Sequence, residues 1–151
     1  MISTQLVQQV YRHAEAASPV ECCGYLNDLA CYPCRNVWIP TPEPEAAPAA
    51  IAYEMAIAET VRLFECVDRC GADRVVIYHS HIDVPPVWSS ADERLARWRG
   101  KVILPDVRRL IVAVSAGRAD SAQVFAFREG AFRCVARFDV LGEMVGPVSH
   151  R

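Results

Sequence analysis

Apolar residues recur along this chain with helical spacing in some stretches and with strand-like character in others. Apolar positions three or four residues apart predict three helices, over residues 3–17, 53–69 and 89–99. The first helix is expected to end at Ser18-Pro19, because helical geometry is disfavoured before proline, and Gly71 is a stop signal after the second. In the second helix the periodic positions are Ile57, Val61 and Phe64. In the third they are Ala91, Leu95 and Trp98, which are expected to face inward.

Short runs rich in β-branched and aromatic residues predict strands between these helices. They cover residues 20–26, 31–39, 74–78, 107–115, 123–127 and 132–138. The run RVVIY at 74–78 is almost continuously apolar and indicates a buried strand. The last two runs form a predicted hairpin around Glu129-Gly130, and residues 139–151 show no periodicity. This order of elements predicts one α/β domain over 1–151, a sandwich with a mixed sheet.

A proline-rich segment separates the second predicted strand from the second helix. Residues 40–48 contain four prolines with two glutamates between them, which excludes a regular helix or a central strand. The segment is either a plain connector or a lid or substrate rail beside a site.

Composition and charge narrow the function classes. The chain is 52% apolar and 23% charged, as in globular proteins, and its net charge of −2 argues against nucleic acid as the main partner. It lacks an apolar run long enough for a membrane span and a secretion signal at the amino terminus, so a cytoplasmic location is expected. One basic stretch is either a solvated face or a docking patch for an acidic protein; it comprises Arg94, Arg97, Arg99, Lys101, Arg108 and Arg109.

The chain has seven cysteines, an odd number that a complete disulfide framework would not accommodate. Without a secretion signal, free thiols are expected, several of them buried. The cysteines are Cys22, Cys23, Cys31, Cys34, Cys66, Cys70 and Cys134.

The candidate chemistry lies at the end of the predicted strand 74–78. His79 and His81 are two residues apart, so on a strand both imidazoles point the same way. Asp92, in the first turn of the third predicted helix, can reach back to them. Two histidines and one carboxylate leave a fourth position for water, as in a catalytic zinc site. Glu21, at the start of the first predicted strand, is the candidate general base.

A second interpretation of the same residues is structural. Ser89-x-x-Asp92 is also the pattern of a capping box at a helix amino terminus. Capping and metal binding are compatible, because Asp92 could ligate a metal while Ser89 caps the helix.

The string His79-Ser80-His81, seven residues, Ser89, two residues, Asp92, with Glu21 far upstream, resembles the signature of the JAMM (MPN+) zinc metalloproteases. The stretches ECCGYL, RNVWIP and VVIYHSH are similar to those of the small bacterial members, and the resemblance covers about residues 3–138. It implies a sheet sandwiched by helices, similar to that of the cytidine deaminases.

The resemblance also implies roles for these residues and a substrate class. His79, His81 and Asp92 would ligate Zn²⁺, Glu21 would hold and deprotonate the water, and Ser89 would donate a hydrogen bond to the oxyanion. The implied substrate is an amide bond after the terminal Gly-Gly of a ubiquitin-like (β-grasp) sulfur-carrier protein. Many members have proline where this chain has Ile82 and Trp88, a difference that concerns substrate detail rather than zinc.

Three other functions compete with this hypothesis. A zinc deaminase would need His-x-Glu and Pro-Cys-x-x-Cys, which this chain lacks. A binding module could hold a structural zinc through Cys31, Cys34 and the Cys22-Cys23 pair, although one Cys-x-x-Cys is weak evidence. A non-catalytic scaffold would typically lose ligands that are all present here.

Overall fold

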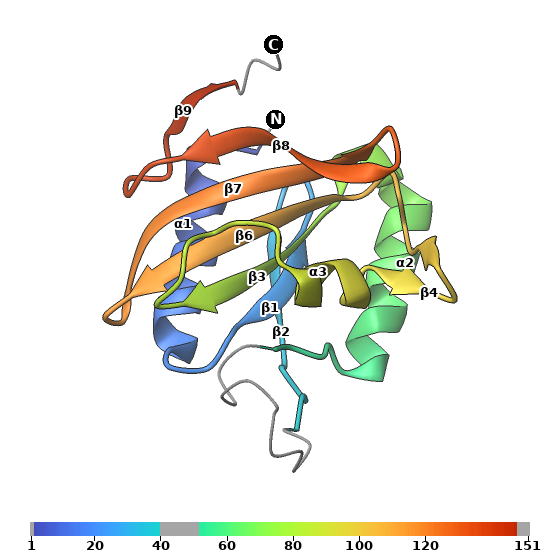
Figure 1. Ribbon diagram of the computed structural model, residues 1–151, viewed down its shortest axis with the longest axis horizontal. Helices are drawn as coiled ribbons and strands as arrows, with labels where there is room; N and C mark the ends of the chain where they lie inside the picture. Colours follow the sequence, from blue (N-terminus) through green and yellow to red (C-terminus); the bar gives the residue numbers. More distant parts are fainter. Residues whose placement is uncertain (1, 40–51, 148–151) are drawn as a thin grey trace.

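The computed structural model describes residues 2–39 and 52–147, so the proline-rich segment 40–48 lies outside the described residues (Figure 1). The helical elements are α1 (Thr4–Ala17), α2 (Ile57–Cys70), the short 3-10 helix η1 (Ala72–Arg74) and α3 (Ser90–Leu95). The strands are β1 (Cys23–Leu26), β2 (Cys31–Cys34), β3 (Val76–Ile82), β4 (Arg97–Trp98), β5 (Lys101–Val102), β6 (Arg108–Ser115), β7 (Arg118–Arg128), β8 (Ala131–Phe138) and β9 (Met144–Pro147).

Seven strands form one mixed sheet in the order β2-β1-β3-β6-β7-β8-β9. Only β3 and β6 run parallel, and the other neighbouring pairs are antiparallel. A parallel pair needs a long crossover, and here the crossover carries α3 and the β4-β5 hairpin. The prediction of an α/β domain with a mixed sheet is therefore confirmed.

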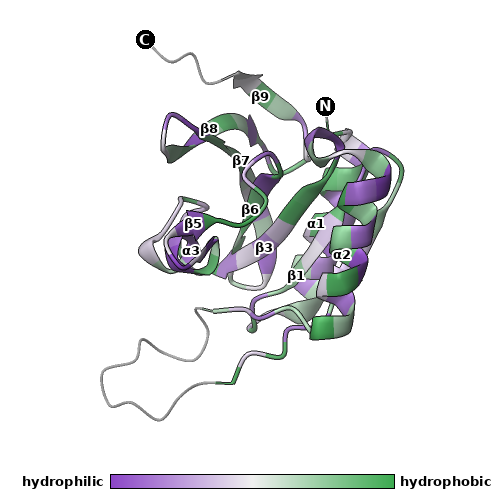
Figure 2. Ribbon diagram, turned by 90° about the vertical axis from the view of Figure 1, so that its right-hand side faces the viewer, coloured by the Kyte–Doolittle hydropathy of each residue, from purple (hydrophilic) through white to green (hydrophobic). Residues whose placement is uncertain are grey.

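Helices α1 and α2 cover opposite faces of the sheet (Figure 1). Successive side chains on a strand alternate between the two faces, so Val76 and Tyr78 of β3 pack in the core under α1. Ile77 points the other way, into the core that α2 covers. Purple and green segments alternate along both helices in Figure 2, as expected of amphipathic helices with one face on the sheet.

The structure confirms α2 as a helix, but the apolar positions that predicted it face away from the sheet. The helix begins at Ile57 rather than at 53, and the periodic residues Ile57, Val61 and Phe64 are 82%, 53% and 42% exposed. A second apolar stripe with the same helical spacing is the one that faces the sheet: Leu63, Cys66, Val67 and Cys70. Both stripes have helical spacing, so only tertiary packing determines which of them faces the sheet.

The third predicted helix is wrong beyond Leu95. Residues 97–98 and 101–102 pair as a small hairpin, whose turn residues Arg99 and Gly100 have φ of +49° and +79°. Positive φ at both turn positions is what two-residue hairpins require. Leu95 and Trp98, expected inside, are therefore exposed, and Ala96 is buried instead.

Strand boundaries also differ from the predictions. β1 begins at Cys23 rather than at 20, β2 ends at Cys34 rather than at 39, and β9 was not predicted. β3 continues to Ile82 because neighbouring strands extend beside it, with Cys23 of β1 opposite His79 and Ala113 of β6 opposite His81. Both histidines are thus strand residues, not loop residues.

The seven cysteines are all free thiols, as predicted. In the described part of the chain, no helix is long and apolar enough to cross a membrane.

Candidate metal and active site

His79 and His81 extend from the same face of β3, the face opposite α1. Both side chains are buried, and their Nε2 atoms lie 3.2 Å apart. The neighbouring strands bury both rings and restrict their orientation. Because the two residues are two apart on a strand, their Nε2 atoms converge on one point.

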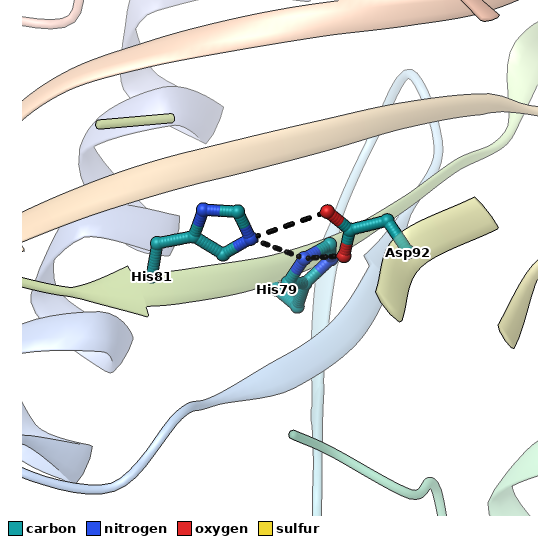
Figure 3. Close-up of side chains that lie close together, drawn as sticks. All are labelled: His79, His81 and Asp92. Carbon is teal, nitrogen blue, oxygen red and sulfur yellow. Dashed lines mark hydrogen bonds and ion pairs between the residues drawn. The ribbon is translucent and has the colours of Figure 1, made fainter. Parts of the chain in front are cut away.

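Asp92 reaches the two imidazoles from the first turn of α3 (Figure 3). Its Oδ1 lies 2.8 Å from His79 Nε2, and its Oδ2 lies 3.4 Å from His81 Nε2. The three potential ligand atoms lie within 4.8 Å of one another, all on buried residues. Within residues 2–39 and 52–147, no other group of three or more His, Cys, Asp or Glu side chains converges in this way.

The Asp92 carboxylate also completes a capping box. The Ser89 backbone N–H and hydroxyl donate to Asp92 Oδ2 at 2.7 and 2.6 Å, and the Ser89 Oγ accepts from the Asp92 backbone N–H at 3.1 Å. The capping interpretation is therefore confirmed, and the same carboxylate lies against the histidines. These bonds restrict the rotation of Asp92 and hold it toward β3.

His81 is oriented from its other side by the loop that follows β3. Its Nδ1 lies 3.0 Å from the carbonyl oxygen of Pro85. Because a carbonyl only accepts, Nδ1 carries the proton, and the lone pair of a neutral ring is left on Nε2. The loop thus places a metal-competent nitrogen toward Asp92.

The protonation states follow from burial and from this contact geometry. Burial lowers the pKa of His79 despite its bond to Asp92. For His81, burial is outweighed by the bonds to Asp92 and to the Pro85 carbonyl, so its pKa is raised. Burial raises the pKa of the Asp92 carboxyl, but its contacts with His79 and His81 outweigh burial and hold that pKa far below the usual range. The group therefore presents an ionised carboxylate beside at least one neutral imidazole.

Glu21 lies between α1 and β1 and is almost fully buried. The Asn36 side chain donates to its backbone carbonyl at 3.0 Å, which ties this segment to residues beyond β2. Glu21 lines a cavity of about 210 Å³ together with His81, Ser89 and Asp92. Burial raises the pKa of Glu21 to about 8, against the attraction of His81. The structure therefore brings together all five residues singled out from the sequence.

A second cavity, of about 130 Å³, is lined by His79 and Asp92 among others. Tyr53 lines both cavities and stacks on His79, with ring centroids 4.6 Å apart. Trp88 lines the second cavity and stacks on Phe132 at 4.0 Å, and it donates to Glu93 at 2.7 Å. Nothing in the sequence around Tyr53 or Trp88 indicates these positions, because they depend on packing between distant elements.

Arg109 also lines the second cavity and requires a correction. Both interpretations of the basic stretch placed it on or beside a solvated surface, but it is only 5% exposed. Alternation along β6 turns its side chain to the face that carries His79, since Arg109 pairs with Ile77 in the parallel register. The other basic residues of the stretch stay at least partly exposed.

The fold and the site together define the class of this protein. It is an α/β domain with a buried group of two histidines and one carboxylate. Such a group has the donor set of a metal site with an open position.

Comparison with known proteins places the chain in a family. Residues 3–129 match the model described as prokaryotic homologues of the JAB domain, and the chain belongs to this family. The resemblance to JAMM proteins is therefore confirmed. A desampylase from Haloferax volcanii is 37% identical over 100 residues, which cover 60% of this chain and 66% of that protein, slightly less than two thirds of its length.

Two solution structures share the fold. A protein from Desulfitobacterium hafniense has a TM-score of 0.57 at 19% identity, with 88% of this chain and 87% of that chain covered. A protein from Salinibacter ruber has a TM-score of 0.51 at 19% identity, with 89% and 88% covered.

Proposed function

We propose that this protein is a zinc-dependent peptidase or isopeptidase that hydrolyses the amide bond after the terminal Gly-Gly of a ubiquitin-like sulfur-carrier protein. The observation that carries the proposal is the convergence of His79, His81 and Asp92 beside a cavity that also holds Glu21. Family membership and the name of the Haloferax relative, which is that of an enzyme, support it.

The donor set fits zinc. Two imidazole nitrogens and a carboxylate oxygen, all buried and within 4.8 Å of one another, match the three protein ligands of catalytic zinc sites. The Pro85 carbonyl and the Ser89 hydroxyl orient His81 and Asp92 from behind, as outer partners do in such sites. Bound zinc would supply Lewis acidity, lowering the pKa of water and polarising the substrate carbonyl.

Glu21 is the proposed proton carrier. Glu21 lines the same cavity as His81 and Ser89, and a carboxylate there could take a proton from the attacking water and deliver it to the leaving amine. A cation at the neighbouring ligands would favour the ionised form that this role needs, because opposite charge lowers a carboxyl pKa. The apolar surroundings of Glu21 favour its protonated form only moderately in that state, so it can pass the proton on to the leaving amine.

Ser89 is the proposed donor to the oxyanion. It lines the cavity with Glu21, and its hydroxyl proton is directed to Asp92 in this structure. Turning that proton toward a substrate oxygen would give the charge-directed hydrogen bond that such intermediates need.

The cavity walls support an extended, small-residue tail as substrate. Val84, Val87 and Leu95 line the space next to Glu21, and a cavity of about 210 Å³ has room for the two glycines of such a tail. A free thiol at all seven cysteines fits the reducing cytoplasm in which such a carrier would be met.

The test is to incubate the zinc-loaded protein with a β-grasp carrier extended beyond Gly-Gly and to read the carrier's mass. The expected product is the carrier ending in Gly-Gly, with no product after chelation. Asp92→Ala should lose both zinc and activity, whereas Asp68→Ala, an exposed carboxylate on α2, should keep both. Full zinc occupancy in Asp92→Ala would contradict the ligand assignment, and an unchanged carrier mass would contradict the proposed reaction.

A further inference from the structure

Arg109 is a buried cation that the proposed mechanism does not use. It belongs to β6 and lines the cavity of about 130 Å³ that His79, Asp92 and Tyr53 also line. A guanidinium is always charged in proteins, and burying a charge is costly unless it is paired. Its surroundings therefore indicate what the cavity is built to hold.

The protein groups around this guanidinium are neutral. It donates to the carbonyls of Val107 and Ile103, both at 2.7 Å, and more weakly to Leu104 at 3.5 Å. It also lies 5.9 Å from the ring centroid of Phe132. Among the residues that the structure describes, no carboxylate oxygen lies within 4.0 Å of it.

These contacts hold the guanidinium in place but leave its charge uncompensated. Carbonyl bonds occupy donors on both terminal nitrogens, and a guanidinium has five N–H groups in all. The one carboxylate that lines the cavity, Asp92, is engaged by His79, His81 and Ser89. A planar anion entering the cavity would meet a fixed cationic fork, the partner that guanidinium groups pair with best.

We propose that this cavity receives the free carboxylate of a single small residue directly beyond the scissile amide, with Arg109 as its partner. The proposal rests on the proposed function and names its substrate class: a carrier tail of the form Gly-Gly-X that ends in a free carboxylate. A cavity of about 130 Å³ is comparable to engineered cavities of about 150 Å³ that hold a benzene molecule, so it has room for one small residue but not for a folded protein.

The reaction is an ordinary hydrolysis. Water adds its oxygen to the carbonyl carbon of the second glycine, the C–N bond breaks, and the amine of residue X takes the proton that Glu21 carries. The products are the carrier ending in a Gly-Gly carboxylate and the free amino acid X.

A purely structural role would also account for the carbonyl contacts, since Arg109 ties residues 103–107 to the start of β6. The two roles differ in one respect. If Arg109 is only structural, the rate should not depend on whether the substrate ends in a free carboxylate or an amide. If Arg109 binds the carboxylate, the rate should depend on it.

The first experiment therefore uses the unmodified protein, loaded with zinc. Two carriers are compared, one ending in Gly-Gly-Ala with a free carboxylate and one ending in Gly-Gly-Ala-amide. Hydrogen bonds to charged groups are worth enough to change kcat/KM by about 10- to 100-fold, so the acid should be cut faster by that factor. Equal kcat/KM for acid and amide would overturn the proposal while leaving the proposed function intact.

Variants assign the preference to a residue. Arg109→Gln should abolish the preference for the acid, and Arg109→Lys should keep part of it. The matched control is Arg108→Gln, which removes the same charge one residue away, where the guanidinium contacts the Asp73 carbonyl at 2.9 Å; it should keep the full preference. A preference that persists in Arg109→Gln would assign carboxylate recognition to the metal and overturn the proposal.

A binding measurement separates the two proposals. The peptide Gly-Gly-Ala and its amide are titrated calorimetrically into zinc-loaded wild-type protein and Arg109→Gln. Tighter binding of the acid that depends on Arg109, without cleavage of either carrier, would support the carboxylate site and refute the proposed function. Equal binding of acid and amide would refute the site whatever the carriers do.

Discussion

The Ser89 hydroxyl and the Asp92 carboxylate are joined by a hydrogen bond of 2.6 Å, while the Asp92 backbone N–H donates to the same hydroxyl at 3.1 Å. This reciprocal pair begins α3 and also turns the carboxylate toward His79 and His81. Helix capping and orientation of the proposed ligand Asp92 are thus two consequences of one local structure.

Removing that hydroxyl should affect both consequences. Ser89→Ala loses the cap, worth about 1 kcal/mol of folding stability, and frees Asp92 to rotate. Loss of an outer partner of a ligand typically weakens metal affinity by about 10- to 100-fold. Zinc competition titration and thermal unfolding measure the two effects, with Ser89→Thr as the control that retains a hydroxyl. Unchanged zinc affinity in Ser89→Ala would show that Ser89 does not position the ligand.

The site residues differ in how far local sequence determines them. His79 and His81 could be recognised because spacing by two on a strand is sufficient to align them, and Ser89 and Asp92 because a capping box is local. Glu21 was a candidate base by its residue type and its place at the start of a predicted strand, and the family resemblance supported it, since its distance from the histidines along the chain carries no geometric information.

Tyr53 and Arg109 could not have been predicted as cavity residues. Their positions depend on how the segment before α2 and the strand β6 pack against β3. Arg109 also occurs among several exposed basic residues, so composition favoured a surface position. Which face of α2 packs on the sheet could not be predicted either, because the periodic residues Ile57, Val61 and Phe64 and the buried stripe with its cysteines both have helical spacing.

The face of α2 that packs on the sheet can be tested with truncations at two nearby positions. Leu63→Ala removes a side chain that is 4% exposed and contacts the core under α2, which should cost about 2–4 kcal/mol of unfolding free energy. Val61→Ala, at a position 53% exposed, should stay within about 0.5 kcal/mol of wild type. Urea denaturation measures both. A larger loss at Val61 than at Leu63 would contradict the orientation of the helix.

The proposed role of Glu21 predicts a separation of activity from metal binding. Glu21→Gln keeps the volume of the side chain but cannot carry a proton, so turnover should fall by about 10²- to 10⁴-fold. Zinc content should not change, because Glu21 is not among the proposed ligands. Glu65→Gln, on the exposed side of α2, serves as the control for the charge change. Substantial turnover by Glu21→Gln would contradict the mechanism, and a zinc-free Glu21→Gln protein would make Glu21 a ligand.

Glu21 should also make the metal-free protein less stable as pH rises. Burial raises its pKa in the folded protein from an ordinary value of 4.5 to about 8, so between these pH values the folded state holds a proton that the unfolded state has released. Stability from this group is therefore complete below about pH 4.5 and is lost as pH rises to about 8. The loss is on the order of a few kcal/mol, since each unit of pKa difference corresponds to about 1.4 kcal/mol. Glu21→Gln escapes this loss, so in the presence of a chelator it should melt several degrees above wild type at pH 8, with the gap closing toward pH 4.5. Melting temperatures across that range, with Glu65→Gln as reference, test the prediction, and a gap that does not vary with pH would contradict the buried, protonated state of Glu21.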